Sequence, residues 1–162
     1  MKLRRDPKGN LRFYLTRREA QLVSQTLAFY PLLNSDFHRL SKTLRGSKAR
    51  SAQRLLEQAM AQQRRSHRLE AERFIKSFAR STPARGVGVR AARIDSLLQI
   101  LNDVRVGSWL KLDQPDFEHG RWPKITEETL PYLMAMECCG LFQSAILHSL
   151  EAAESSGPAE NK

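Results

Sequence analysis

The sequence predicts a mainly α protein, a helical bundle of four to five helices with a short N-terminal β-hairpin. Apolar residues recur at helical spacing along most of the chain, the connectors are short, and a Pro–Gly turn separates two strand-like segments at the start. With 162 residues, 41% of them hydrophobic, the chain suits one domain with its own core. We expect this domain to span residues 1–154, followed by a disordered tail over 155–162.

The hairpin is predicted over residues 1–15. Its turn has Pro7 at the second position and Gly9 at the fourth, which is typical of a type I turn. The turn would join Lys2–Arg5 to a strand over 11–15. Because two isolated strands are marginally stable in water, we expect the hairpin to lie on the helices.

Basic helices are predicted over residues 16–80. A capping box opens the first: Thr16 can accept a hydrogen bond from the Glu19 amide while Glu19 reaches back. Four apolar positions continue this helix at helical spacing: Ala20, Val23, Leu27 and Tyr30. Pro31 ends it. A shorter helix is expected over 35–45, capped at its start by a Ser or Asp and closed by a glycine.

The longest helix is predicted over 47–80, because neither Gly nor Pro interrupts these residues. At about 100° per residue, one side of it is apolar and is expected to meet the core: Ala52, Leu55, Leu56, Ala59, Met60, Phe74 and Phe78. Six cations lie within about 120° on the other side, and we call them the basic face: Arg50, Arg54, Arg64, Arg65, Arg68 and Lys76. At a rise of 1.5 Å per residue the basic face is about 40 Å long.

Residues 81–90 are predicted to be a flexible linker, because Pro83 stops the long helix and two glycines follow. Acidic and apolar helices are expected over 91–154. The first runs over 91–112 with its apolar side toward the core, and a loop over 114–124 follows.

The last helix is predicted to start at Thr126 and is apolar in nearly every direction. A helix of this kind is usually enclosed on all sides, which suggests the central helix of the bundle. In the alternative, other helices cover one side and a second copy of the chain covers the other, giving a homodimer. Met134, Met136 and Gly140 suit an adaptable contact with close approach.

Charge is divided unevenly along the chain. Residues 1–93 contain 22 Lys and Arg against 6 Asp and Glu, whereas residues 94–162 contain 5 against 11, so the net charges of +16 and −6 give the total of +10. This division indicates a binding surface on the first half and a packing or docking role for the second. A solvated helix face would also account for the arginines. Because most carboxylates lie in the second half, we expect few i,i+4 partners on the basic face. Two alternative ligands fit the basic face. One is the backbone of a polyanion such as nucleic acid, and the other is an acidic protein surface.

No pattern in the sequence indicates an enzyme, a metal or a cofactor. The four histidines are far apart, and Cys138 and Cys139 are adjacent, so no zinc-site spacing exists. We expect both cysteines to be small residues of the core. The acidic residues over 113–119 lack calcium-loop spacing, and the glycines at 86 and 88 lack the rest of a phosphate loop.

Localisation in a reducing bacterial cytoplasm is expected. The first residues, Met-Lys-Leu-Arg-Arg, lack the apolar core of a secretory signal, and adjacent cysteines do not form an ordinary disulfide. The apolar segment over 132–150 is interrupted by Glu137, Gln143 and His148, which favours a buried helix over a membrane span.

Three short motifs resemble a family of uncharacterised bacterial helical proteins, the domain-of-unknown-function family two-thousand-seventeen: Leu15-Thr16-x-x-Glu19-Ala20, Phe37-His38-Arg39-Leu40-Ser41 and Leu101-Asn102-Asp103-Val104-Arg105. The resemblance covers about two-thirds of the chain in pieces, and it does not include the Arg-rich helix. Genes of that family often lie beside the gene for the Clp protease adaptor. The resemblance thus implies a link to regulated proteolysis, and it brings no functional site.

Asn102, Asp103 and Arg105 form a second candidate cluster. Asn102 and Arg105 share one helix face, and Asp103 lies about a quarter-turn round. The cluster is interpreted either as structural, tying down a loop or the hairpin, or as a polar site for a partner. The sequence therefore predicts a non-enzymatic binding or adaptor module, and alternatively an interaction protein that acts with the Clp adaptor or protease.

Overall fold

The computed structural model describes residues 1–33 and 47–154, and it is mainly α, as predicted. Within these residues there are four α-helices, one short 3₁₀-helix and one three-stranded sheet. In chain order their bounds are β1 Lys2–Arg5, β2 Leu11–Tyr14, α1 Arg17–Leu27, α2 Ser47–Ala79, β3 Val87–Val89, the 3₁₀-helix η2 Ala91–Arg93, α3 Ile94–Lys111 and α4 Leu130–Glu154. The short helix expected over 35–45 and the tail over 155–162 lie outside the described residues.

The predicted hairpin is confirmed. Strands β1 and β2 pair antiparallel along their whole length. In the turn between them the Gly9 amide donates to the Asp6 carbonyl at 2.9 Å, and Gly9 has a φ of 79°, which glycine adopts without a steric penalty. The Asp6 carboxylate accepts the amides of Lys8 and Asn10, both at 2.9 Å, and so closes the turn.

The flexible linker predicted over 81–90 is wrong in part, because Val87–Val89 form β3. This strand pairs antiparallel with β2, so the hairpin becomes the β1-β2-β3 sheet. Val87 and Val89 are buried and Gly88 is exposed, the alternation expected of a strand with one face on the core. Three residues are too few for this alternation to be recognised in the sequence.

Helices α1 and α2 form where they were predicted, although α1 ends at Leu27 and does not continue to Tyr30 as expected. The Thr16 hydroxyl accepts from the Glu19 amide at 3.3 Å, and the Glu19 carboxylate accepts from the Thr16 amide at 2.7 Å, which completes the capping box of α1. Helix α2 has 33 residues and ends one residue before the expected boundary.

Two later boundaries differ from the predictions. The helix expected over 91–112 begins as η2 and continues as α3. Helix α4 begins at Leu130 and not at Thr126. Before it, the Thr129 hydroxyl donates to the Lys124 carbonyl at 2.6 Å and accepts from the Thr126 amide at 2.8 Å. These bonds hold the segment in a turn, in keeping with the tendency of Thr side chains to compete with helical bonding.

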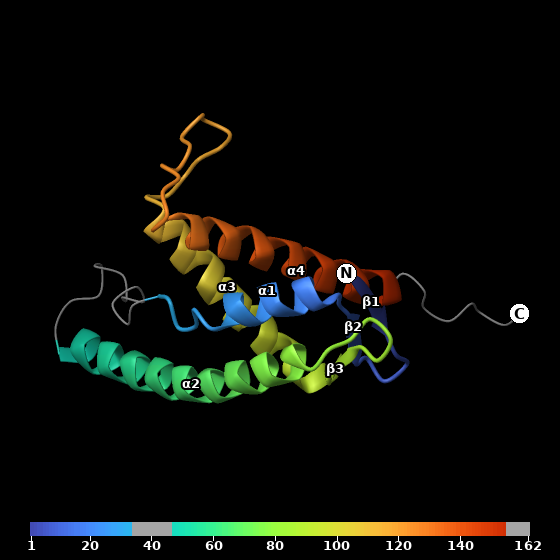
Figure 1. Cartoon of the computed structure of the whole chain (residues 1–162). Helices are drawn as coiled ribbons and strands as arrows, with labels where there is room; N and C mark the ends of the chain where they lie inside the picture. The colour runs from blue at the N-terminus through green and yellow to red at the C-terminus, as the bar shows by residue number, and fades with distance from the viewer. Residues whose placement is uncertain (34–46, 155–162) are drawn as a thin grey trace, which may run out of the picture.

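Both halves of the chain contribute to one core. Phe13 of β2 packs against Phe78 of α2, at a ring-centroid distance of 5.4 Å, and against Phe142 of α4, at 6.1 Å. Phe78 and Phe142 also contact each other, with ring centroids 6.4 Å apart. Figure 1 shows α2 and α4 on opposite sides of the molecule with α1 and α3 between them, and α3 packs closely against α4. The basic helix and the apolar helix therefore present their outer sides in different directions.

Candidate functional site

The basic face of α2 is largely open to solvent. Five of its members are exposed: Arg50, Arg54, Arg65, Arg68 and Lys76. Within residues 1–33 and 47–154, none of these five forms an ion pair. The sixth, Arg64, is half-buried and lines a cleft on another side of the helix. Five guanidinium and ammonium groups are thus available to an external anion.

Carboxylates are fewer on the basic face, but they are not absent from it. Glu57 and Glu72 fall on the same side of α2 at about 100° per residue, so the expectation that i,i+4 partners would be scarce is only partly right. Glu72 is four residues from both Arg68 and Lys76 without an ion pair to either, and Glu57 accepts a hydrogen bond from Gln53 at 2.9 Å. The five exposed cations outnumber these two carboxylates.

The apolar side of α2 meets the core only near the end of the helix. Ala71, Phe74 and Phe78 are buried, whereas Leu55 is 66% exposed and Ala59 is also exposed. The expected core contact is therefore wrong for the first half of the helix. In the view of Figure 1 the start of α2 extends past the ends of α1, α3 and α4.

The three members of the second cluster point to different neighbours. One carboxylate oxygen of Asp103 accepts the backbone amides of Leu32 at 2.8 Å and Leu33 at 3.3 Å, as expected for a residue that ties down a loop. Arg105 donates to the Gln143 side chain of α4 at 3.4 Å. The exposed Asn102 side chain makes no hydrogen bond within the described part of the chain. The structure therefore does not bring the three together as one site.

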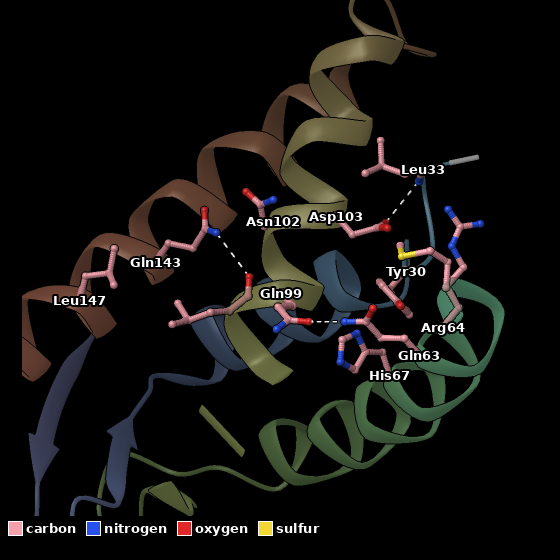
Figure 2. A pocket seen from close by; sticks show the side chains of 12 residues that line it. Tyr30, Leu33, Gln63, Arg64, His67, Gln99, Asn102, Asp103, Gln143 and Leu147 are labelled. Carbon is pink, nitrogen blue, oxygen red and sulfur yellow. Dashed lines mark hydrogen bonds between the residues drawn. The ribbon is translucent and has the colours of Figure 1, made fainter. Parts of the chain in front are cut away.

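A cleft of about 440 Å³ opens beside Asp103, between α2, α3, α4 and the segment that follows α1. Figure 2 shows its polar side chains, among which Gln63 of α2 donates to Gln99 of α3 at 2.7 Å. Burial lowers the pKa of His67, against smaller opposing effects of nearby carboxylates. Burial, with the Asp103 charge, raises the pKa of Tyr30. At neutral pH these groups are uncharged hydrogen-bonding partners, and their rings lie 6.3 Å apart between centroids.

A second hollow, of about 580 Å³, lies on the α3–α4 side of the molecule. Its apolar lining includes Trp109 of α3, Met136 and Leu141 of α4, and Phe117 from the loop between these helices. Sequence patterns do not reveal this hollow, because it forms only where α3, the loop and α4 meet.

Helix α4 is not the enclosed central helix that its composition suggested. One side is buried in the core, through Cys139, Phe142 and Ile146 among others. The opposite side leaves Met134 half-exposed and Leu141 67% exposed. By length and composition one stretch of the described chain, Leu130–Ala152, could cross a bilayer, with a mean hydropathy of 1.3 and 33% of it buried. A single helix of this kind is a weak indication of a membrane span.

Both cysteines are buried in the core, as expected for cysteines that act as small core residues. Burial raises the pKa of Cys138, and it raises that of Cys139 to about 12, so both thiols stay protonated at neutral pH and are poor nucleophiles. Across residues 1–33 and 47–154, no three His, Cys, Asp or Glu side chains gather in a way that could hold a metal ion. In the acidic loop, Asp116 instead contacts His119 at 2.9 Å and Arg121 at 3.5 Å.

No protein-family model matches this chain, and no curated protein and no solved structure is detectably similar to it.

Proposed function

We propose that the protein is a non-enzymatic binding module. Its basic face binds the charged backbone of a polyanion. The observation that carries the proposal is the row of five exposed cations on α2, none of them in an ion pair within the described residues. Four of the five are arginines, which bind phosphate oxygens in a bidentate manner. Nucleic acid is the polyanion that we propose, and an acidic protein surface is the competing ligand.

The length of the row supports backbone-directed binding. From Arg50 to Lys76 the helix rises about 40 Å, comparable to one turn of a nucleic-acid duplex. The exposed aromatic residues lie elsewhere, so α2 has no platform on which single-stranded bases could stack. Contacts to phosphates with little sequence preference are the form of binding that these residues support.

In the proposal, the remaining parts of the chain hold the basic face in place. A bundle of four to five helices in a bacterial cytoplasmic protein would hold α2 by its buried second half, through Phe74 and Phe78, while the first half reaches outward. In this account Asp103 is structural, and the contacts to the polyanion belong to α2.

The proposal is tested by binding to mixed-sequence RNA and DNA at two salt concentrations. If Z phosphates are neutralised, log K falls against log salt with a slope of about −0.7Z for single strands and −0.9Z for duplexes. Binding that is absent at low salt, or that does not weaken with salt, contradicts the polyanion proposal.

An interaction protein that acts with the Clp adaptor or protease is the alternative function. It follows from the proposed membership of the domain-of-unknown-function family two-thousand-seventeen, and the exposed apolar residues around Leu141 support a protein ligand. A pull-down from bacterial lysate with and without nuclease separates the two. Clp components that survive nuclease treatment favour the alternative, and nuclease-sensitive recovery of nucleic acid favours the basic face.

A further inference from the structure

The solvent side of α4 has the spacing of a helix that packs against another helix. Six exposed residues follow one another in alternating steps of four and three, and we call them the outer seam: Leu130, Met134, Glu137, Leu141, Ser144 and His148. This spacing averages 3.5 residues and keeps all six on one line along the helix. Three of the six are large apolar residues in contact with water, although the opposite side of the same helix is already buried in the core.

An exposed aromatic pair stands beside the outer seam. Residues 113–129 project from the end of α3 and α4 as an arm, seen in orange in Figure 1. Trp122 in this arm is 74% exposed and packs edge-on against Phe117 with ring centroids 5.0 Å apart. The Trp109 indole of α3 donates to the Pro115 carbonyl at 3.0 Å, which fastens the base of the arm. An anchored arm that holds an indole in water is typical of an interaction surface.

The same side of the molecule also contains a hollow and both signs of charge. Phe117 and Leu141 belong both to the exposed apolar surface and to the lining of the 580 Å³ hollow between α3 and α4. Arg105 lines it from α3 and Glu137 lines it from α4. One surface therefore contains the projecting Trp122 indole and a hollow. It also contains a cation, Arg105, and an anion, Glu137.

We propose that this surface binds a second copy of the chain, with the two α4 helices packed antiparallel about a two-fold axis near Leu141. In such a contact a surface meets itself, so it must contain both members of each complementary pair. Arg105 of each copy faces Glu137 of the other, and the two Leu141 side chains meet at the axis. Figure 1 shows α2 on the opposite side of the molecule from α4, so the two helices that carry the basic faces lie away from the contact and repel one another little through salt solution.

Other occupants fit this surface less well. A bilayer would have to bury Arg105 and Glu137, and ionised groups in hydrocarbon are costly. Nucleic acid is disfavoured because residues 94–162 contain 11 acidic residues against 5 basic ones. A second copy satisfies both charges and covers the apolar seam.

Light scattering at tens of micromolar protein is the first test. The wild-type protein is expected to show twice the 18.6 kDa of one chain, and Leu141→Asp is expected to be monomeric. Leu55→Asp is the matched control, because Leu55 of α2 is 66% exposed against 67% for Leu141 and lies outside the proposed contact. A monomeric wild-type protein, or a Leu141→Asp variant that remains dimeric, overturns the proposal. A monomer that binds phosphatidylcholine vesicles until Leu141 is replaced would assign the surface to a membrane and would also overturn it.

A charge exchange tests the partner contact itself. Arg105→Glu and Glu137→Arg are each expected to raise the dimer dissociation constant at least tenfold, because each places like charges opposite one another. The double variant is expected to restore most of the affinity. Failure of the double variant to recover, with circular dichroism unchanged, rejects the Arg105–Glu137 pairing across the two-fold axis. None of these measurements depends on polyanion binding, so they stand apart from the test of the proposed function.

Discussion

The carboxylate of Asp103 accepts a hydrogen bond from the backbone amide of Leu32 at 2.8 Å and so joins α3 to the segment that follows α1. The same oxygen accepts the Leu33 amide at 3.3 Å. Partly buried backbone amides outside a helix need such an acceptor. This polar side chain in α3 therefore holds a neighbouring segment in place, next to the cleft that Tyr30 and His67 line.

Removing the Asp103 acceptor should destabilise the protein. In Asp103→Ala two partly buried amides lose their partner, and we expect a loss of about 1–3 kcal/mol in the free energy of unfolding. Asp103→Asn keeps an oxygen acceptor and should lose clearly less. Urea unfolding followed by circular dichroism measures both, and equal stability of the Ala variant and wild type would contradict this role.

Close packing at Gly107 provides a second prediction. A Cβ at this position would lie 2.7 Å from both Cβ and Cγ of Leu32, closer than carbon atoms approach without movement. Gly107→Ala should therefore cost about 1–3 kcal/mol through overpacking, although Ala is intrinsically better than Gly in a helix. Gly140→Ala is the control, since its nearest neighbour would be 3.8 Å away, and it should cause no loss at low protein concentration. Equal effects of the two substitutions would contradict the account.

The Glu70 carboxylate connects α2 to the start of α3, and it predicts a pH dependence. It accepts from Arg93 at 2.5 Å and from Arg73 at 2.6 Å. Burial alone would raise the pKa of Glu70, but these hydrogen bonds outweigh it, and the pKa lies below its ordinary value of 4.5. Stability from a lowered carboxylate pKa is present above the unfolded value and is lost as the pH falls through the folded value.

Glu70→Gln tests this connection. At pH 7 the variant should lose about 1 kcal/mol, since it keeps an acceptor but loses the charge. As the pH falls below about 4.5, the difference from wild type should shrink, because Glu70 itself becomes protonated. Thermal unfolding between pH 3 and pH 7 measures this. A difference that stays constant over that range would show that the charge of Glu70 contributes nothing.

Elements with a strong local signal could be predicted from the sequence. The capping box at Thr16, the turn at Gly9 and the uninterrupted 33-residue helix α2 depend on neighbours within a few residues, so composition and spacing are enough to find them. The buried end of α2 at Phe74 and Phe78 was also expected, because apolar spacing indicates which side of a helix turns inward.

Features that depend on distant segments could not be predicted. The strand β3 exists because β2 lies beside it, and its three residues contain no pattern of their own. The apolar composition of α4 could not show that only one side is covered, since Leu141 and Ile146 are equally apolar and differ only in what lies opposite. The hollow beside Trp109 likewise requires α3, the arm and α4 in their folded positions.

The central claim is that the basic face binds a polyanion, and matched triple variants test it most directly. Arg54, Arg65 and Arg68 are replaced by Ala in one protein, and three exposed arginines outside α2 are replaced in the other: Arg17, Arg18 and Arg90. Both variants lose three positive charges. Affinity for a mixed-sequence RNA or DNA is then measured at two salt concentrations by fluorescence anisotropy. We predict that the α2 variant loses affinity and that its log–log salt slope is shallower by about 2, while the control stays close to wild type. Equal losses in the two variants would show that net charge alone drives binding, and would contradict a site on the basic face.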